Sequence, residues 1–126
     1  MPIRNISWDE TVQAISGLTQ KIKDSQQKAG KRFTGVYGIP RGGQVVAIML
    51  SYALELPYLG APTEFCIVAD DVTSSGKTLE CYRRAAVKVA IAKYKDCPYE
   101  PTFWEIEIET GQTIFPWERL WEPHIS

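Results

Sequence analysis

The chain has 126 residues, of which 44% are hydrophobic and 23% charged, and its formal net charge at pH 7 is −1. This composition is typical of one soluble globular domain and argues against a disordered or fibrous chain. It also lacks the basic excess of a nucleic-acid-binding domain, so we expect no nucleic-acid partner.

A helix is expected to begin after Ser7, because the stretch SWDE has the pattern of a capping box between Ser7 and Glu10. Its inward stripe is predicted at apolar residues spaced by three and four, and Gly30 is placed to end the helix. The members of that predicted stripe are Trp8, Val12, Ile15, Leu18 or Thr19, and Ile22.

The middle of the chain alternates strand and helix signals. The predicted strands are FTGVYGI (33–39), LPYLG (56–60), FCIVAD (65–70) and AVKVAIAKY (86–94). The predicted helices are QVVAIMLSYAL (44–54) and GKTLECYRRA (76–85). This order is typical of an α/β fold with a mostly parallel sheet flanked by helices.

From Asp96 the chain is richer in proline and aromatic residues and contains one alternating segment, TFWEIEIE (102–109). We expect a single domain over residues 1–126, in which about 96–126 form a strand and a small hood over one end of the sheet. The only histidine, His124, is assigned no role.

The cysteines and the apolar runs bear on location. Cys66, Cys81 and Cys97 have neither an even count nor the spacing of metal ligands, which favours a reducing compartment. No apolar run is long enough to span a membrane, and MPIRNISWDE lacks the apolar core of a signal peptide. We therefore expect a cytoplasmic protein without a membrane partner.

The segment CIVADDVTSSGKT (66–78) runs from an apolar strand into two carboxylates and then into a loop rich in hydroxyl groups. In a parallel sheet, ligands lie beyond the carboxyl ends of the strands, where loops meet the amino ends of helices. The helix is expected to begin near Ser75 or Gly76, so the backbone amides of residues 74–77 favour a phosphate. Further donors are the hydroxyl groups of Thr73, Ser74, Ser75 and Thr78.

The ending SGKT also occurs in the phosphate-binding loop of nucleoside triphosphatases, but that loop needs a glycine five residues before Gly76. Asp71 occupies this position, and its carboxylate would repel a triphosphate, which argues against an ATPase or kinase. Two adjacent carboxylates at a strand end instead suit sugar hydroxyls or a divalent cation. The alternative is that Asp70 and Asp71 only cap the helix.

The order of strand, Asp70, Asp71, Gly76 and Thr78 resembles the signature of the type I phosphoribosyltransferases. The resemblance implies that the acidic pair lies at the ribose hydroxyls of phosphoribosyl pyrophosphate and supports Mg²⁺. It also implies that the loop holds the 5-phosphate, through Thr73, Ser74, Ser75, Gly76, Lys77 and Thr78.

A second motif, VYGIPRGG (36–43), is similar to the pyrophosphate loop of the same family. Arg41 offers a charged donor to the pyrophosphate, while Gly42 and Gly43 let the backbone come close to it. Alone, Arg-Gly-Gly between a strand and a helix is often only a turn. Its position before the acidic pair strengthens the resemblance.

A third motif, FPWE (115–118), is similar to one in the xanthine and guanine phosphoribosyltransferases, where it lies in the hood that covers the base. The resemblance implies that Phe115 lies near the base. It also implies that Lys93, at the end of the fourth strand, lies near an exocyclic oxygen of a purine. The alternatives are core packing for Phe115 and Trp117, and a plain surface position for Lys93.

The chain departs from the family pattern at the lid and at the base. Only GAPTE (60–64) separates the second and third strands, where the family has a long flexible loop that closes over the substrates. Ser74 stands where the purine enzymes have an Asp that assists proton transfer, and it is a weaker general base. Gln112 stands where the subfamily stacks an aromatic residue on the purine.

Two functions are therefore predicted. The first is a phosphoribosyltransferase that transfers ribose 5-phosphate to a nucleobase, with a purine favoured, and releases pyrophosphate; Asp70, Asp71 and Ser74 are its expected catalytic residues. The second is a module that binds phosphoribosyl pyrophosphate or a nucleotide as a sensor, with little or no turnover. The resemblance also implies a homo-oligomer, with helix 44–54 as a candidate for the interface, although a buried core helix explains its apolar face equally well. A third possibility is that a partner subunit supplies the lid.

Overall fold

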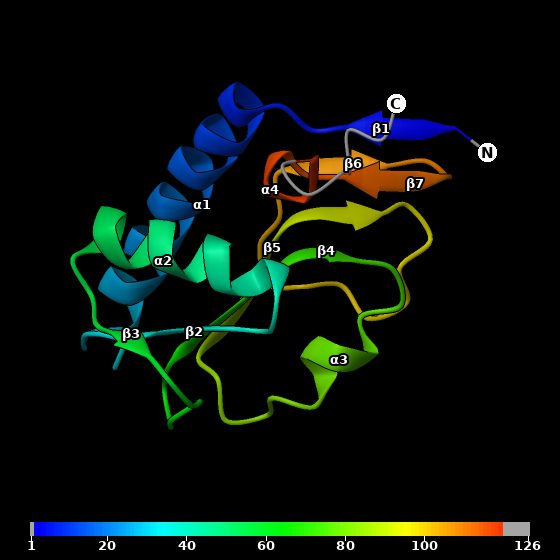
Figure 1. The fold of residues 1–126 in the computed structure, drawn as a ribbon. Helices are drawn as coiled ribbons and strands as arrows, with labels where there is room; N and C mark the ends of the chain where they lie inside the picture. Colours follow the sequence, from blue (N-terminus) through cyan, green and yellow to red (C-terminus); the bar gives the residue numbers. More distant parts are fainter. Residues whose placement is uncertain (1, 120–126) are drawn as a thin grey trace.

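The computed structural model describes residues 2–119 (Figure 1), so His124 lies outside the described residues. Along the chain the elements are β1 (Ile3–Asn5), α1 (Trp8–Ala29), β2 (Val36–Gly38), α2 (Gly42–Leu54), β3 (Tyr58–Leu59), β4 (Ile67–Thr73), α3 (Lys77–Glu80), β5 (Val87–Tyr94), β6 (Ile106–Ile108), β7 (Gln112–Ile114) and α4 (Pro116–Arg119). Among these helices, none combines the length and apolarity that a membrane span requires.

Within residues 2–119 the main sheet has five strands in the order β3-β2-β4-β5-β6, and each neighbouring pair is parallel. The longest pairing joins β4 to β5, from Ile67 opposite Val87 to Thr73 opposite Lys93. The expected fold class, an α/β fold with a mostly parallel sheet flanked by helices, is confirmed. The carboxyl ends of β2 and β4 therefore meet at one edge of the sheet.

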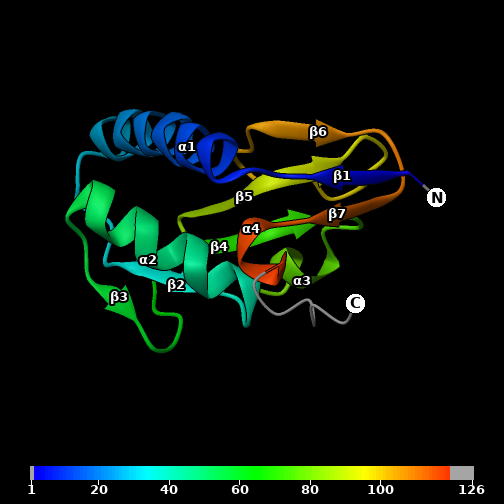
Figure 2. The same ribbon diagram turned by 45° about the horizontal axis from the view of Figure 1, so that its top comes forward.

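The hood combines the two ends of the described chain (Figure 2). Strand β1 pairs in parallel with β7, with Ile3 opposite Gln112 and Asn5 opposite Ile114, and α4 follows β7 directly. The sequence placed the hood in about residues 96–126. In the structure β6 belongs to the main sheet, the described hood consists of β1, β7 and α4, and residues 120–126 lie outside the described part.

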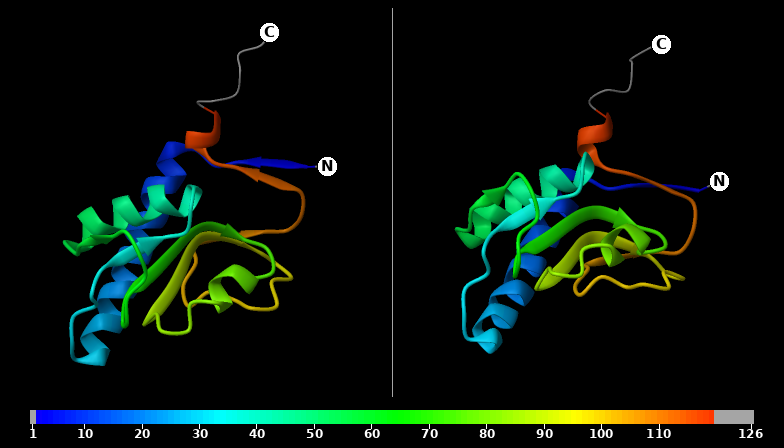
Figure 3. Two further views of the ribbon diagram at one scale, coloured as in Figure 1. Left: turned by 60° about the horizontal axis from the view of Figure 1, so that its bottom comes forward. Right: turned by 90° about the horizontal axis from the view of Figure 1, so that it is seen from below.

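The helices cover the two faces of the sheet unequally, and Figure 3 shows α2 and α3 on opposite sides of it. On one face, α1 and α2 pack against buried side chains of β4 and β5, among them Ile67, Ala69, Val87, Val89 and Ile91. On the other face, Leu79 of α3 packs against Cys66 and Val68. The larger core thus lies under α1 and α2.

The start and end of α1 are as predicted, and so are Ile15, Leu18 and Ile22 of its buried stripe, but the first residues of the stripe are not. Ser7 Oγ accepts from the Glu10 N–H at 3.0 Å, Glu10 Oε1 accepts from the Ser7 N–H at 3.1 Å, and Gly30 ends the helix at a φ of 73°. Trp8 and Val12, predicted to face inward, are 47% and 55% exposed. The residues that α1 buries are Thr11, Ala14, Ile15, Leu18 and Ile22.

The difference has a physical cause in the hood. At the start of α1, either residues 8 and 12 or residues 11 and 14 continue the stripe of 15, 18 and 22 at a period of about 3.6 residues, so the neighbours of the helix decide which pair is buried. The ring of Trp8 packs against Trp117 of α4, with ring centroids 6.0 Å apart, and thus contacts the hood instead of the sheet.

The predicted helix over 76–85 is shorter than expected, because α3 ends at Glu80. Since β5 runs parallel to β4, the chain must travel back along the sheet before Val87. A helix advances only about 1.5 Å per residue, whereas extended chain advances about 3.3 Å. Residues 81–86 therefore leave the helix, and Tyr82 packs against Tyr37 with centroids 5.8 Å apart.

Candidate functional site

A cleft of about 680 Å³ lies where β2 and β4 end, α2 begins and α4 folds over the sheet. Its lining residues are Pro40, Arg41, Gly42, Val45, Asp70, Asp71, Trp117 and Glu118. The cleft thus brings together the turn after β2, the end of β4 and the hood, which are far apart in the sequence. This is the end of a parallel sheet at which ligands bind.

The turn between β2 and α2 lies directly against the acidic pair. A Cβ atom on Gly42 would collide with the Asp71 carboxylate, and one on Gly43 would press on the carbonyl oxygen of Ala69. The Ile39 N–H donates to this same carbonyl oxygen at 2.9 Å. Only residues without a side chain allow the turn to come this close, so both glycines are explained by packing.

The acidic pair is half-buried, and its two carboxylates are close to each other. The Asp71 N–H donates to Asp70 Oδ1 at 2.9 Å, and the Val72 N–H donates to Asp71 Oδ1 at 2.7 Å. Burial, and after it the charge of Asp71, raises the pKa of Asp70 to about 8. The pair is therefore suited to a cation or to hydroxyl donors, either of which would relieve the repulsion.

These two carboxylates fit a magnesium ion only in part. In residues 2–119 no group of three or more His, Cys, Asp and Glu side chains is arranged to hold a metal. Mg²⁺ prefers six oxygen ligands and is commonly held by one or two carboxylates together with substrate phosphates. Asp70 and Asp71 match the carboxylate share of such a site, so the remaining oxygens would come from substrate and water.

The phosphate loop, residues 73–78, follows the acidic pair at the end of β4. Thr73 is buried, Ser74 is exposed, and Gly76 has a φ of 81° immediately before α3 begins at Lys77. Ser75 Oγ accepts from the Lys77 N–H at 3.2 Å. Because α3 has only four residues, its dipole is small, and backbone amides and hydroxyl groups are the main phosphate donors that the loop offers.

Lys93 does not line the cleft. Its side chain is 3% exposed, and Nζ lies 2.8 Å from Glu100 Oε2 and 3.3 Å from Glu107 Oε1. The ammonium group also lies 4.8 Å from the ring centroid of Trp104. The hydrogen bond to Glu100 raises the pKa of Lys93, so this lysine is a paired, buried cation and not a plain surface residue.

In the hood the cleft is lined by Trp117 and Glu118, whereas Phe115 is 0% exposed. Phe115 stacks under Trp117, with ring centroids 4.9 Å apart and planes at 9°. Glu118 Oε1 accepts from the Phe115 N–H at 2.8 Å and so caps α4. The geometry thus favours core packing for Phe115, and its contact with a base stays a prediction. Sequence reasoning singled out FPWE and placed Phe115 near the base, whereas Trp117 and Glu118 are the members of this motif that line the cleft.

Of the residues expected at the site, the structure gathers Arg41, Gly42, Asp70 and Asp71 around the cleft. Gly43 packs behind the turn, and the phosphate loop extends from the acidic pair without lining the cleft. Residues 60–66 join β3 to β4 as a short connection, so no long lid segment lies between these two strands.

No protein-family model matches the chain, and no curated protein matches it in sequence. Solved structures do. A purine phosphoribosyltransferase from Pyrococcus horikoshii gives a TM-score of 0.77, covering 94% of this chain and 95% of that one, at 20% identity. The Helicobacter pylori xanthine-guanine-hypoxanthine phosphoribosyltransferase gives 0.75, covering 93% and 94%, at 15% identity.

The chain has the type I phosphoribosyltransferase fold. A further neighbour with this fold is a hypothetical protein from Neisseria gonorrhoeae with bound ppGpp, at a TM-score of 0.69 and 19% identity, covering 94% of this chain and 91% of that one. The motif resemblance to the phosphoribosyltransferases is therefore confirmed for the fold. The near-equal coverage of both chains means that this short chain spans the full architecture of these neighbours.

Proposed function

We propose that the protein is a phosphoribosyltransferase that transfers ribose 5-phosphate from phosphoribosyl pyrophosphate to a nucleobase and releases pyrophosphate. One observation carries the proposal: the Asp70–Asp71 pair and the Arg41–Gly42 turn face one cleft of about 680 Å³ on this fold. A sugar carrying two anionic groups needs hydroxyl acceptors between two anion sites. The acidic pair lies between the turn and the phosphate loop in this way.

Each part of the site then has a distinct role. Asp70 and Asp71 accept hydrogen bonds from the ribose hydroxyls and fix the ring. The amides and hydroxyl groups of residues 73–78 hold the 5-phosphate, while Arg41 and the amides of Gly42 and Gly43 hold the pyrophosphate. As the bond from the anomeric carbon to nitrogen forms, the bond to pyrophosphate breaks and pyrophosphate leaves with the electron pair. Positioning and charge stabilisation lower the barrier.

The metal and the base complete the proposal. Asp70 and Asp71 would support Mg²⁺, which supplies positive charge that offsets the charge of the leaving pyrophosphate. Trp117 is proposed to cover the base, since its ring lines the cleft opposite the acidic pair. Ser74 is proposed to accept a hydrogen bond from the base, and as a weak base it predicts slow turnover. A purine is favoured because the named enzymes with this fold act on purines.

A second candidate is a sensor module that binds phosphoribosyl pyrophosphate or a nucleotide without efficient turnover. The Neisseria gonorrhoeae neighbour favours it, since that protein was solved with a nucleotide, ppGpp. The short connection over residues 60–66 favours it too, because an open cleft admits water to the reacting centre. A homo-oligomer and a cytoplasmic location stay predictions from the sequence.

Calorimetric titration with phosphoribosyl pyrophosphate and magnesium, followed by a panel of purines and pyrimidines with product detection, separates the two candidates. Binding together with a nucleotide product is expected. Binding without product would favour the sensor, and the absence of binding would reject both. Asp71→Asn is the matched test of the site, because it removes the charge while it keeps the shape of the side chain.

A further inference from the structure

The connection between β5 and β6 packs on the phosphate loop. We name residues 96–100 the clamp segment. Its Tyr99 N–H donates to the carbonyl oxygen of Ser75 at 3.2 Å. The Tyr99 carbonyl oxygen lies so close to Gly76 that a Cβ atom there would collide with it. The clamp segment thus touches the loop at two consecutive residues, at its sharpest turn.

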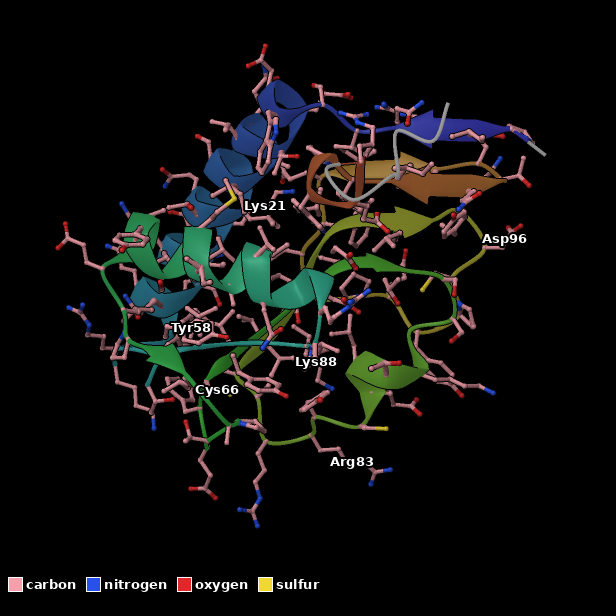
Figure 4. The ribbon with its side chains drawn as sticks, in the orientation of Figure 1. Lys21, Tyr58, Cys66, Arg83, Lys88 and Asp96 are labelled. Atoms are coloured by element: carbon pink, nitrogen blue, oxygen red, sulfur yellow. The ribbon has the colours of Figure 1, made fainter. Side chains whose placement is uncertain are left out.

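Figure 4 shows Asp96, the first residue of the clamp segment, on the side of the molecule away from Cys66, which precedes β4. The turn into the clamp segment is itself fixed. The Cys97 N–H donates to the carbonyl oxygen of Tyr94 at 3.1 Å, and Cys97 Sγ donates to that of Tyr99 at 3.3 Å. The position of Tyr99 therefore follows from the end of β5.

Lys93 ties the clamp segment to the strand beside the loop. It lies opposite Thr73, the first residue of the phosphate loop, in the pairing of β4 with β5. Its ammonium group pairs with Glu100, the neighbour of Tyr99, at 2.8 Å. The Lys93 side chain is 3% exposed and that of Glu100 is 51% exposed. We name this ion pair the strut; Lys93 is its buried end and Glu100 its solvent-exposed end.

The phosphate loop has little support of its own. Its helix has four residues, and Gly76 holds a left-handed conformation in the middle of the turn. A phosphate site gains affinity when its backbone is ordered before the ligand arrives, because the entropic cost of ordering the backbone then does not reduce the binding free energy. The clamp segment is the neighbouring part of the chain that contacts this turn.

We propose that Lys93 and Glu100 are positioning residues that preform the phosphate loop by holding Tyr99 against Ser75 and Gly76. This assigns Lys93 a task different from contact with a base. Its ammonium group already has two carboxylates and the Trp104 ring around it, and a buried lysine needs such partners. The ligand of the preformed loop, a sugar 5-phosphate, rests on the proposed function.

The test uses the whole protein without ligand and compares three variants. Glu100→Gln and Lys93→Met break the strut, whereas Glu107→Gln is the matched control, because Glu107 pairs with the same ammonium group at 3.3 Å but belongs to β6. Amide hydrogen exchange is measured for residues 74–78, for Tyr99 and for the central residues of β4. We expect exchange in the loop and at Tyr99 to rise about three- to tenfold in the first two variants.

A loss of general stability alone would raise exchange in β4 as well, whereas loss of the clamp raises it only in the loop. Lys93→Arg keeps the pair with Glu100 and should restore protection. Equal exchange in Glu100→Gln and the wild type, or an equal rise in Glu107→Gln, would overturn the proposal.

A titration with ribose 5-phosphate follows on the same samples. The affinity should fall about three- to tenfold in Glu100→Gln and stay unchanged in Glu107→Gln. If the affinity in Glu100→Gln equals that of the wild type, the clamp does not preform the site. If the wild type itself does not bind ribose 5-phosphate, the proposed function fails, while the exchange data still decide whether the clamp orders the loop.

Discussion

The sugar-phosphate half of the site and the hood are built in different ways. The acidic pair lies in β4, near its carboxyl end, and the Arg41–Gly42 turn follows β2. These two strands are paired in the main sheet. The hood is held by two three-residue strands, a four-residue helix and the stack of Trp117 on Phe115. Strands of the main sheet thus position the first half, whereas a separate two-stranded sheet and the aromatic stack position the second.

The difference teaches that the two halves can change independently. A shift in β4 would disturb the core, whereas the hood can alter its cleft-facing side chain without moving a strand of the main sheet. This agrees with the sequence, in which the motifs of the sugar-phosphate half follow the phosphoribosyltransferase pattern and Gln112 near the hood departs from it.

The largest effect is expected for Gly76→Val in the sugar-phosphate half. The residue has a φ of 81°, and its side chain would collide with the Tyr99 backbone. We expect a loss of stability of about 2–4 kcal/mol together with loss of phosphoribosyl pyrophosphate binding. Thermal unfolding measures the loss of stability, and calorimetric titration measures the binding of phosphoribosyl pyrophosphate. Gly60→Ala is the control, because no atom lies within 4 Å of a Cβ atom there; similar effects in both variants would contradict the prediction.

Asp71→Asn should keep the fold and lower the activity. The carboxylate lies against Gly42 in the cleft, and its loss removes a charged acceptor from the ribose site. We expect kcat/KM to fall about 100-fold, which corresponds to a loss of ~3 kcal/mol of transition-state stabilisation, with little change in the unfolding midpoint. Steady-state kinetics measure this, and Asp9→Asn on the exposed face of α1 is the control. An unchanged kcat/KM would place the ribose elsewhere.

Trp117→Ala probes the hood alone. Removal of the ring takes away the cleft-facing surface opposite the acidic pair, so KM for the base should rise about tenfold. The affinity for phosphoribosyl pyrophosphate should stay the same, because no strand of the main sheet is touched. Trp117→Phe keeps an aromatic ring stacked on Phe115, so its rise in KM for the base should be smaller. If both affinities fell together in kinetics and calorimetry, the two halves would not be independent.

The last prediction concerns Asp70 and the pH dependence of the free energy of unfolding. Its pKa is raised in the folded state, from 3.8 to about 8, so the native protein holds a proton that the unfolded chain releases. Stability should therefore fall as the pH rises through this window. Asp70→Asn removes the titrating group and should flatten the curve. Denaturant unfolding between about pH 5 and 9 measures it; identical slopes for the two proteins would show that Asp70 ionises normally.

Much of the fold could be predicted because its signals are local. The capping box at Ser7 and Glu10 satisfies backbone donors within one turn, so neighbouring residues suffice to specify it. The strands β4 and β5 are short, apolar and rich in β-branched residues, which favours a buried parallel strand in any context. The site motifs at Arg41 and Asp70 adjoin these strands, so their meeting at one edge follows from a parallel sheet.

Other features could not be predicted because they depend on distant partners. The first residues of the α1 stripe were misjudged, since Trp8 packs on Trp117 of the hood, whereas Ile15, Leu18 and Ile22 are buried as predicted. The length of the helix after Gly76 was overestimated, because the chain must leave the helix in order to return along the sheet to the start of β5. The pairing of Lys93 with Glu100 and Glu107 joins side chains that the sequence pattern treats as unrelated.

The sequence alone predicts the order of strands and helices from α1 to β6, the capping box, and the acidic and glycine motifs at the strand ends, but not β1, β7 and α4. These predictions rest on backbone preferences and on periodicity, which act over a few residues. Three features depend on the tertiary structure: Trp117 lines the cleft while Phe115 is buried, β1 completes the hood, and Lys93 pairs with Glu100. Each of these depends on contacts between segments far apart in the chain, whose geometry local preferences do not specify.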